Sequence, residues 1–235
     1  GLRRHRLVWL KPSGWQRLVD QDAGPDADPA RQPPLPGRDA VSRECLAWWA
    51  AHDLPLVVTI QGRPGDGRGP LAPLDPLAPL ALGLAAPGRW QRRRIGLITR
   101  LADVDRVGDF PLASEIVGHL PVDDRPAWHQ LCSRLHERGA LARVFGSHGW
   151  QRLSGLDHLR AGSDIDLLIA VTDAAQADAV VAVLASFASP RCRIDGELTF
   201  DGQHFVAWRE WAAARSGRTR ELLVKSLEGA RLVPA

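Results

Sequence analysis

The stretch "FGSHGWQRLSGLDHLRAGSDIDLLIAV", residues 145–171, is the most informative part of this chain. It begins with a Gly-Ser pair, Gly146 and Ser147, after an apolar segment that reads as a strand. It ends with Asp164 and Asp166 at the head of a second apolar strand. Side chains two residues apart share one face of a strand, so these carboxylates are expected to be neighbours. Like charges this close repel each other unless a cation lies between them.

The two aspartates are the kind of pair that binds Mg²⁺, which takes one or two carboxylates together with substrate phosphates. Two such ions can clamp an in-line phosphoryl displacement. Gly146 allows a close approach of backbone to phosphate, and Ser147 offers a hydroxyl and an N–H at the start of a predicted helix. The alternative is a pair of solvated aspartates at a strand end and an ordinary strand-to-helix turn capped by Ser147.

A third carboxylate is expected on the strand "RIDGEL", residues 193–198. Alternation places Arg193, Asp195 and Glu197 on one face and apolar residues on the other. We predict Asp195 as the third metal ligand and as a base toward a hydroxyl nucleophile, with Glu197 as the second choice. The alternative is an exposed antiparallel face without a ligand.

Further candidates for substrate binding lie around this centre and in the N-terminal half. Two arginines of the segment "RRRIGLIT" suit phosphate groups or an acidic carrier, because guanidinium forks match phosphate oxygens; a solvated basic face is the alternative. Trp150 is a candidate for stacking on adenine, against a role in the core. The predicted phosphate and substrate ligands are Arg92, Arg94, Arg160, Arg209, Trp150 and Gln151.

The pattern along the chain predicts an α+β protein with a mixed sheet flanked by helices in its C-terminal domain. Residues 1–100 are expected to form a small α+β domain with Pro/Gly-rich loops at 20–40 and 62–88. Residues 101–122 are expected to be a linker, and 123–235 the catalytic domain. Strand segments and helical segments alternate from residue 141 onward, which is typical of α/β units.

The composition fits a soluble cytoplasmic protein. Of 235 residues, 30 are Lys or Arg and 27 are Asp or Glu, so the net charge is +3. This small excess does not indicate nucleic-acid binding, although it favours anionic ligands. Three scattered cysteines suggest a reducing compartment and no zinc site. No apolar run reaches the length of a membrane span, so no membrane association is expected.

The order Gly-Ser, then DxD, then an acidic strand resembles the nucleotidyltransferase superfamily typified by DNA polymerase beta. Four further segments narrow the resemblance to the MdcG family, the phosphoribosyl-dephospho-CoA transferases: "RHRLVWL" (4–10), "LPLVV" (54–58), "RRRIGL" (92–97) and "RIDGELTFDGQHFVAWREW" (193–211). The resemblance covers most of the chain and is weak in the loops at 20–40 and 62–88. The gap between Ser147 and Asp164 is longer than in the minimal superfamily pattern.

The resemblance implies a holo-acyl-carrier-protein synthase of malonate decarboxylase. Its donor would be 2'-(5''-triphosphoribosyl)-3'-dephospho-CoA, and its acceptor a serine of the decarboxylase's carrier subunit, with release of pyrophosphate. Asp164 and Asp166 would hold Mg²⁺, Asp195 would complete the site, and Gly146 and Ser147 would bind the leaving pyrophosphate. Two alternatives remain: a nucleotidyltransferase that uses a nucleoside triphosphate on a small molecule, RNA or protein, and a catalytically idle scaffold that binds a carrier or a nucleotide.

Overall fold

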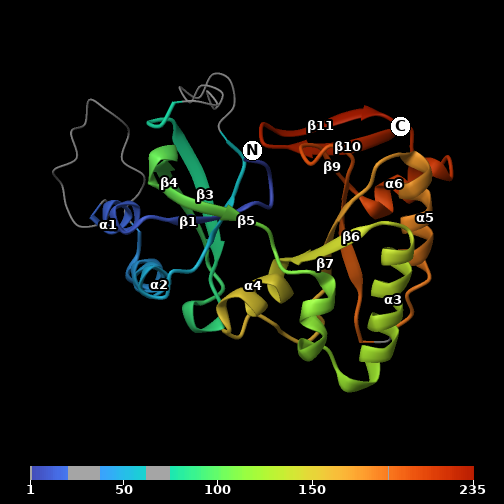
Figure 1. Ribbon diagram of the computed structural model, residues 1–235, viewed down its shortest axis with the longest axis horizontal. Helices are drawn as coiled ribbons and strands as arrows, with labels where there is room; N and C mark the ends of the chain where they lie inside the picture. The colour runs from blue at the N-terminus through green and yellow to red at the C-terminus, as the bar shows by residue number, and fades with distance from the viewer. Residues whose placement is uncertain (1, 21–37, 62–74, 190) are drawn as a thin grey trace. The chain divides into compact units, whose positions relative to one another are not determined.

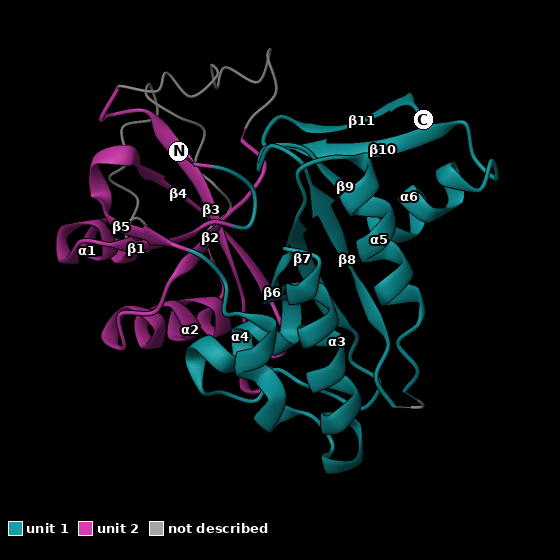
Figure 2. Ribbon diagram, turned by 45° about the vertical axis from the view of Figure 1, so that its right-hand side comes forward, with its two compact units in different colours: residues 1, 3–5, 109–235 teal, residues 2, 6–108 magenta. Residues whose placement is uncertain are grey.

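The computed structural model describes residues 2–20, 38–61, 75–189 and 191–235. The chain divides into two compact units, which Figure 2 distinguishes by colour. One unit contains residues 6–108, and the other contains residues 3–5 together with 109–235. Each unit has its own sheet, and helices accompany both sheets, so the predicted α+β class is confirmed. No helix among the described residues is long and apolar enough to cross a membrane.

The unit of residues 6–108 is built on an antiparallel five-stranded sheet with the order β4-β3-β2-β1-β5. Its strands are β1 (Leu7–Leu10), β2 (Leu56–Val58), β3 (Pro79–Ala85), β4 (Arg94–Arg100) and β5 (Val104–Gly108). Two helices belong to it, α1 (Pro12–Asp20) and α2 (Ala40–Ala51). Asp39 caps α2, since its carboxylate accepts a hydrogen bond of 2.9 Å from the backbone N–H of Ser42.

Two expectations for this half of the chain were wrong. The Pro/Gly-rich segment 62–88 contains strand β3, which pairs with β4 along its whole length. The expected linker 101–122 contains strand β5, which pairs with β1. The repeated prolines and alanines concealed β3, because its apolar residues "LALGLA" do not alternate with polar ones. Helix α1 was not predicted at all. Residues 62–74 of the expected loop, and most of the loop at 20–40, lie outside the described residues.

The second unit is built on a six-stranded sheet with the order β11-β10-β9-β8-β7-β6 (Figure 1). Only β7 and β8 run parallel; the other neighbours are antiparallel. The strands are β6 (Leu141–Phe145), β7 (Ile165–Ala170), β8 (Ile194–Thr199), β9 (Phe205–Ala207), β10 (Glu221–Ser226) and β11 (Gly229–Pro234). Strands β10 and β11 form an antiparallel hairpin at one edge of this sheet.

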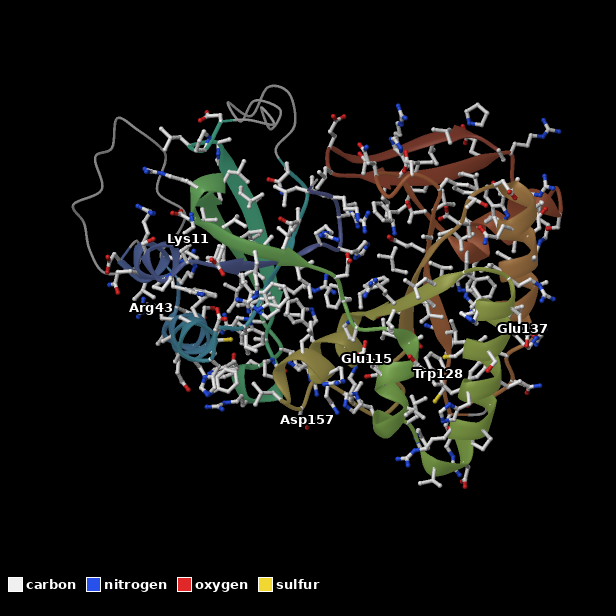
Figure 3. All side chains as sticks on the ribbon, in the orientation of Figure 1. Lys11, Arg43, Glu115, Trp128, Glu137 and Asp157 are labelled. Carbon is white, nitrogen blue, oxygen red and sulfur yellow. The ribbon has the colours of Figure 1, made fainter. Side chains whose placement is uncertain are left out.

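Four α-helices accompany this sheet among the described residues: α3 (Arg125–Glu137), α4 (Gly146–Ser154), α5 (Ala174–Ala185) and α6 (Trp208–Arg215). The core lies between one face of the sheet and α3, α5 and α6. Figure 2 shows α3 and α5 side by side in front of the strands. Trp128 of α3, labelled in Figure 3, is completely buried there, and its indole N–H donates to the carbonyl of Ala113 at 2.8 Å.

The register of the strands decides what the other face of this sheet carries. Ile165, Leu167 and Ile169 of β7 belong to the core. Because side chains alternate, Asp166 of β7 lies on the face opposite these helices. Its register partners share that face, as do the residues two positions along the same strands. This face therefore carries Phe145, Asp166, Asp195, Glu197, Phe205 and Lys225.

Candidate active site

Asp166 and Asp195 lie opposite each other on neighbouring strands. The parallel register of β7 and β8 pairs Asp166 directly with Asp195. Gly196, the residue after Asp195, allows the close approach of the two strands. A Cβ at Gly196 would lie 2.0 Å from the carbonyl oxygen of Leu167, and the residue has a φ of +140°. The two carboxylates are thus brought together by backbone pairing, as expected for a site that concentrates negative charge.

Gly146 lies directly against the carboxylate of Asp166. A Cβ at this position would lie 2.0 Å from Asp166 Oδ2, and the φ of Gly146 is +62°. Both the space and the backbone conformation therefore require glycine here. Gly146 is also the first residue of α4, so the free N–H groups of this helix start beside Asp166. Ser147 is the second residue of the helix and is half-buried.

The charge of Asp166 is poorly compensated. Burial raises the pKa of its carboxyl group, and the neighbouring carboxylates of Asp195, Asp164 and Glu197 raise it further, to about 6. Near neutral pH the group is ionised at a cost in free energy. A divalent cation would remove this cost, because it attracts all the charges that now repel one another. The oxygen-only donor set is the kind that Mg²⁺ prefers.

Asp164 lies just before β7 rather than on it, and it is paired with Arg193. The Nε of Arg193 donates to Oδ1 at 2.8 Å, and Nη2 donates to Oδ2 in a second, short contact. This bidentate pair lowers the pKa of Asp164 below its usual value. Arg193 therefore supplies most of the positive charge beside Asp164 in the ligand-free chain.

Glu197 is held by two basic side chains and is almost completely buried. His5 Nε2 lies 2.9 Å from Oε2, and Lys225 Nζ lies 2.8 Å from Oε1. Burial alone would raise the pKa of Glu197, but the hydrogen bonds and charges of His5 and Lys225 outweigh it and lower the pKa to about 2. With both oxygens engaged, this carboxylate is a poor metal ligand, so Asp195 is the better third member of the predicted set.

Neither His5 nor Lys225 was singled out from the sequence. His5 packs against Phe145 and Phe205, with ring centroids 4.4 and 5.3 Å away, and its φ is +61°. The chain has only two lysines, Lys11 and Lys225, and this scarcity is the one signal in the sequence that distinguished Lys225. Nothing in the sequence places His5 beside residues almost two hundred positions away.

Across the described ranges, no group of three or more His, Cys, Asp or Glu side chains is gathered so as to hold a metal ion alone. The cluster of acidic residues instead consists of the Asp166–Asp195 pair with Asp164 at its edge. Such a pair suits an ion that completes its coordination with phosphate oxygens of a substrate. The set therefore fits Mg²⁺ brought with a polyphosphate.

The side chains of Trp150 and Gln151 are both engaged in contacts within the protein. Trp150 is 4% exposed and makes an edge-to-face contact with Phe110, at a centroid distance of 5.4 Å. A ring buried in this way offers no face to adenine. The side-chain oxygen of Gln151 accepts the backbone N–H groups of His158 and Leu159, both at 3.1 Å. Gln151 thus holds the loop after α4, and its predicted contact with substrate has no support in this packing.

The four predicted arginines fall into two groups. Arg160 and Arg209 line a cavity that also has Asp164 in its lining. Arg209 donates to the carbonyl of Ile194 at 2.8 Å and helps lower the pKa of Asp164. Arg92 and Arg94 belong to the other unit, and their role toward a donor stays a prediction. Arg92 precedes β4 with a φ of +54°, so it is not on the strand with Arg94 as expected.

Comparison with known proteins gives a family for both halves of the chain. Residues 3–110 match the model of the phosphoribosyl-dephospho-CoA transferase MdcG N-terminal domain. Residues 111–235 match the model of the MdcG C-terminal domain. The two matches meet within two residues of the division between the compact units. No solved structure matches the chain.

Curated relatives carry the same name. A phosphoribosyl-dephospho-CoA transferase of Xanthomonas axonopodis pv. citri is 31% identical over 232 residues, covering 98% of this chain and 93% of that protein. One of Bradyrhizobium diazoefficiens is 31% identical over 96% of this chain and 87% of its own length. One of Pseudomonas putida is 34% identical over 66% of this chain and 72% of its own length. The chain therefore belongs to the MdcG family of phosphoribosyl-dephospho-CoA transferases.

Proposed function

We propose that this protein attaches the phosphoribosyl-dephospho-CoA group to a serine of the malonate decarboxylase carrier subunit. The donor would be 2'-(5''-triphosphoribosyl)-3'-dephospho-CoA, and pyrophosphate would be released. The observation that carries the proposal is the Asp166–Asp195 pair, which strand register brings together against the backbone of Gly146. A chain of this family with such a pair has the groups that a transfer from a triphosphate needs.

Asp166 and Asp195 would hold Mg²⁺, with Asp164 as the third carboxylate. When bound, the ion would neutralise charge on the triphosphate and stabilise the charge that develops during transfer. The Arg193 guanidinium pairs with Asp164 in the ligand-free chain and stands where positive charge is needed. On this view Arg193 is free to turn toward phosphate oxygens once a cation compensates Asp164.

The start of α4 would bind the pyrophosphate end of the donor. The N–H groups at residues 146–148 have no partner within the helix, and the helix dipole favours an anion at this end. Ser147 adds a hydroxyl from the same turn. Because Gly146 has no side chain, the Asp166 carboxylate lies directly against this turn. The site thus places anion-binding N–H groups next to the predicted metal ligands.

The transfer itself is a substitution at the α-phosphorus. The carrier's serine oxygen would form a bond to that phosphorus, and the bond from the phosphorus to the bridging oxygen of pyrophosphate would break. The serine proton would pass to Asp195, whose carboxylate is half-buried on the face of the sheet opposite α3, α5 and α6. Positioning and charge stabilisation carry most of the catalysis in reactions of this class.

The proposal is tested by supplying purified apo carrier subunit, the triphosphoribosyl donor and Mg²⁺, and by measuring the intact mass of the carrier. We expect a mass increase equal to the phosphoribosyl-dephospho-CoA group and one pyrophosphate released per group attached. ATP in place of the donor is the control for nucleotidyl transfer. A carrier modified by ATP alone, and not by the donor, would replace this function with that of a general nucleotidyltransferase.

A further inference from the structure

A basic cavity of about 950 Å³ lies within the unit of residues 109–235 and has Asp164, the carboxylate at the edge of the acidic pair, in its lining. It is formed by the end of α5, the start of β8, helix α6 and the loop before β7. Asp164 and Arg193 form one side of it, so the cavity adjoins the predicted metal site. Four further arginines line it: Arg160, Arg191, Arg209 and Arg218. Asp164 is the one acidic residue in its lining.

The charge of these arginines is only partly compensated. Arg193 pairs with Asp164, and Arg191 with the exposed Asp123 at 3.1 Å. Arg209 donates to a backbone carbonyl, and Arg218 to the hydroxyl of Ser216 at 2.9 Å. Carbonyl and hydroxyl partners leave the guanidinium charge in place. A lining with five guanidinium groups and one carboxylate favours a ligand with more than one phosphate group.

Apolar side chains form part of the cavity lining, although most of its exposed surface is polar. Leu184, Phe187, Ile194 and Trp208 contribute to the lining, as do two alanines of α5 and α6. Phe187 is half-buried and packs edge-to-face against Trp128, so its ring is fixed in place. A ligand that carries phosphates together with a smaller apolar part matches this lining. Concave sites of this size commonly bind small molecules, which argues against a protein segment as the occupant.

We propose that this cavity binds the dephospho-CoA part of the donor, with its diphosphate on the arginines and its pantetheine arm along the apolar part of the lining. This inference rests on the proposed function for the identity of the donor. The triphosphate end would lie at Asp166 and Gly146, and Asp164 is shared by the two regions. A nucleoside triphosphate fills only the metal site and leaves the cavity empty. The cavity therefore selects the coenzyme-derived donor over ordinary nucleotides.

The test uses 3'-dephospho-CoA, which lacks the triphosphate and cannot react. Its binding to the full chain is measured by isothermal titration calorimetry. Arg191→Gln together with Arg218→Gln removes two exposed charges of the cavity, and we expect at least about 10-fold weaker binding. Arg231→Gln, on strand β11 outside the cavity, is the matched control. It is expected to leave the affinity unchanged.

A second pair of variants tests the apolar part of the lining without removing a charge. Ala185→Trp places a large ring at a lining position, whereas Ala182→Trp places it at an exposed position of the same helix outside the lining. We expect Ala185→Trp to weaken binding about 10-fold or more, because it fills the space meant for the ligand. Ala182→Trp is expected to bind as the unmodified chain does. Circular dichroism confirms that each variant is folded.

Three results would overturn the proposal. Dephospho-CoA that does not bind the folded chain would exclude the cavity as its site. Equal binding by the cavity variants and their controls would place the ligand elsewhere. Variants that weaken the carrier's affinity and not that of dephospho-CoA would make the cavity a docking site for an acidic protein. Because dephospho-CoA binding needs no transfer, binding without any modification of the carrier would support the cavity and refute the proposed function.

Discussion

Replacement of Asp166 by asparagine should stabilise the ligand-free protein near neutral pH while it removes transfer. The carboxyl pKa of Asp166 is raised from 3.8 to about 6, first by burial and then by the neighbouring carboxylates. The native state therefore holds this proton more tightly than the unfolded chain does. As pH rises between about 4 and about 6, the native state is penalised, and the penalty is complete above that window. Asparagine has no such penalty.

The size of the effect follows from the shift. About 2 pKa units correspond to ~3 kcal/mol as an upper value, since one unit is about 1.4 kcal/mol. The carboxyl group is half-buried, and water reduces the penalty, so we expect Asp166→Asn to gain about 1 to 2 kcal/mol at neutral pH. Near pH 4 the two proteins should be about equally stable, because Asp166 is then protonated in the folded protein.

The assay is urea unfolding of both proteins at several pH values between about 4.5 and 7.5, followed by tryptophan fluorescence. The difference in free energy of unfolding should grow with pH and level off above about pH 6.5. Titrations of groups distant from Asp166 occur in both proteins and cancel in this difference, whereas the neighbouring carboxylates are part of the effect. Asp123→Asn, at an exposed carboxylate, is the control and should show no such growth. A difference that is constant with pH, or that falls as pH rises, would refute the electrostatic reasoning.

Three other perturbations have defined outcomes. Glu197→Gln should lower the free energy of unfolding by about 3 kcal/mol, because it leaves His5 and Lys225 without their buried anion. Urea unfolding measures this change, and a decrease smaller than that of Asp195→Asn would contradict the reasoning. Gly146→Ala should lower the transfer rate at least about 100-fold, because its Cβ meets Asp166; full activity would show that the turn can shift. Addition of Mg²⁺ should raise the thermal unfolding midpoint of the unmodified chain but not that of Asp166→Asn, and EDTA should stop transfer; equal shifts for both proteins would place the ion elsewhere.

The sequence predicted those parts of the fold that depend on local pattern. Alternation identified β7 and β8, because the side-chain period follows directly from backbone geometry. Strand β3 was not predicted, because its residues are apolar on both faces and belong to a Pro/Gly-rich segment. The boundary between the units was not predicted for a related reason. Strand β5 is exposed along much of its length, so its sequence has no clear apolar pattern.

The candidate site was likewise predicted from the sequence only in part. The sequence indicated Asp164 and Asp166 as the pair and Asp195 as the third carboxylate. The register of β7 and β8 instead places Asp166 opposite Asp195, and Asp164 lies just before the strand. The partners of Glu197 could not be predicted from the sequence, because His5 and Lys225 come from opposite ends of the chain. Trp150 looked available from its place after the Gly-Ser turn, but helical geometry directs it into the core. A local sequence pattern does not contain information about contacts between distant segments.

The central claim is that the Asp166–Asp195 pair serves transfer from the triphosphoribosyl donor to the carrier. The most direct test is the intact mass of the apo carrier subunit after incubation with donor, Mg²⁺ and either the unmodified chain or Asp166→Asn. We predict the full mass increase of the phosphoribosyl-dephospho-CoA group with the unmodified chain and none with the folded variant. An equal mass increase with both proteins would contradict the assignment of this pair as the catalytic centre.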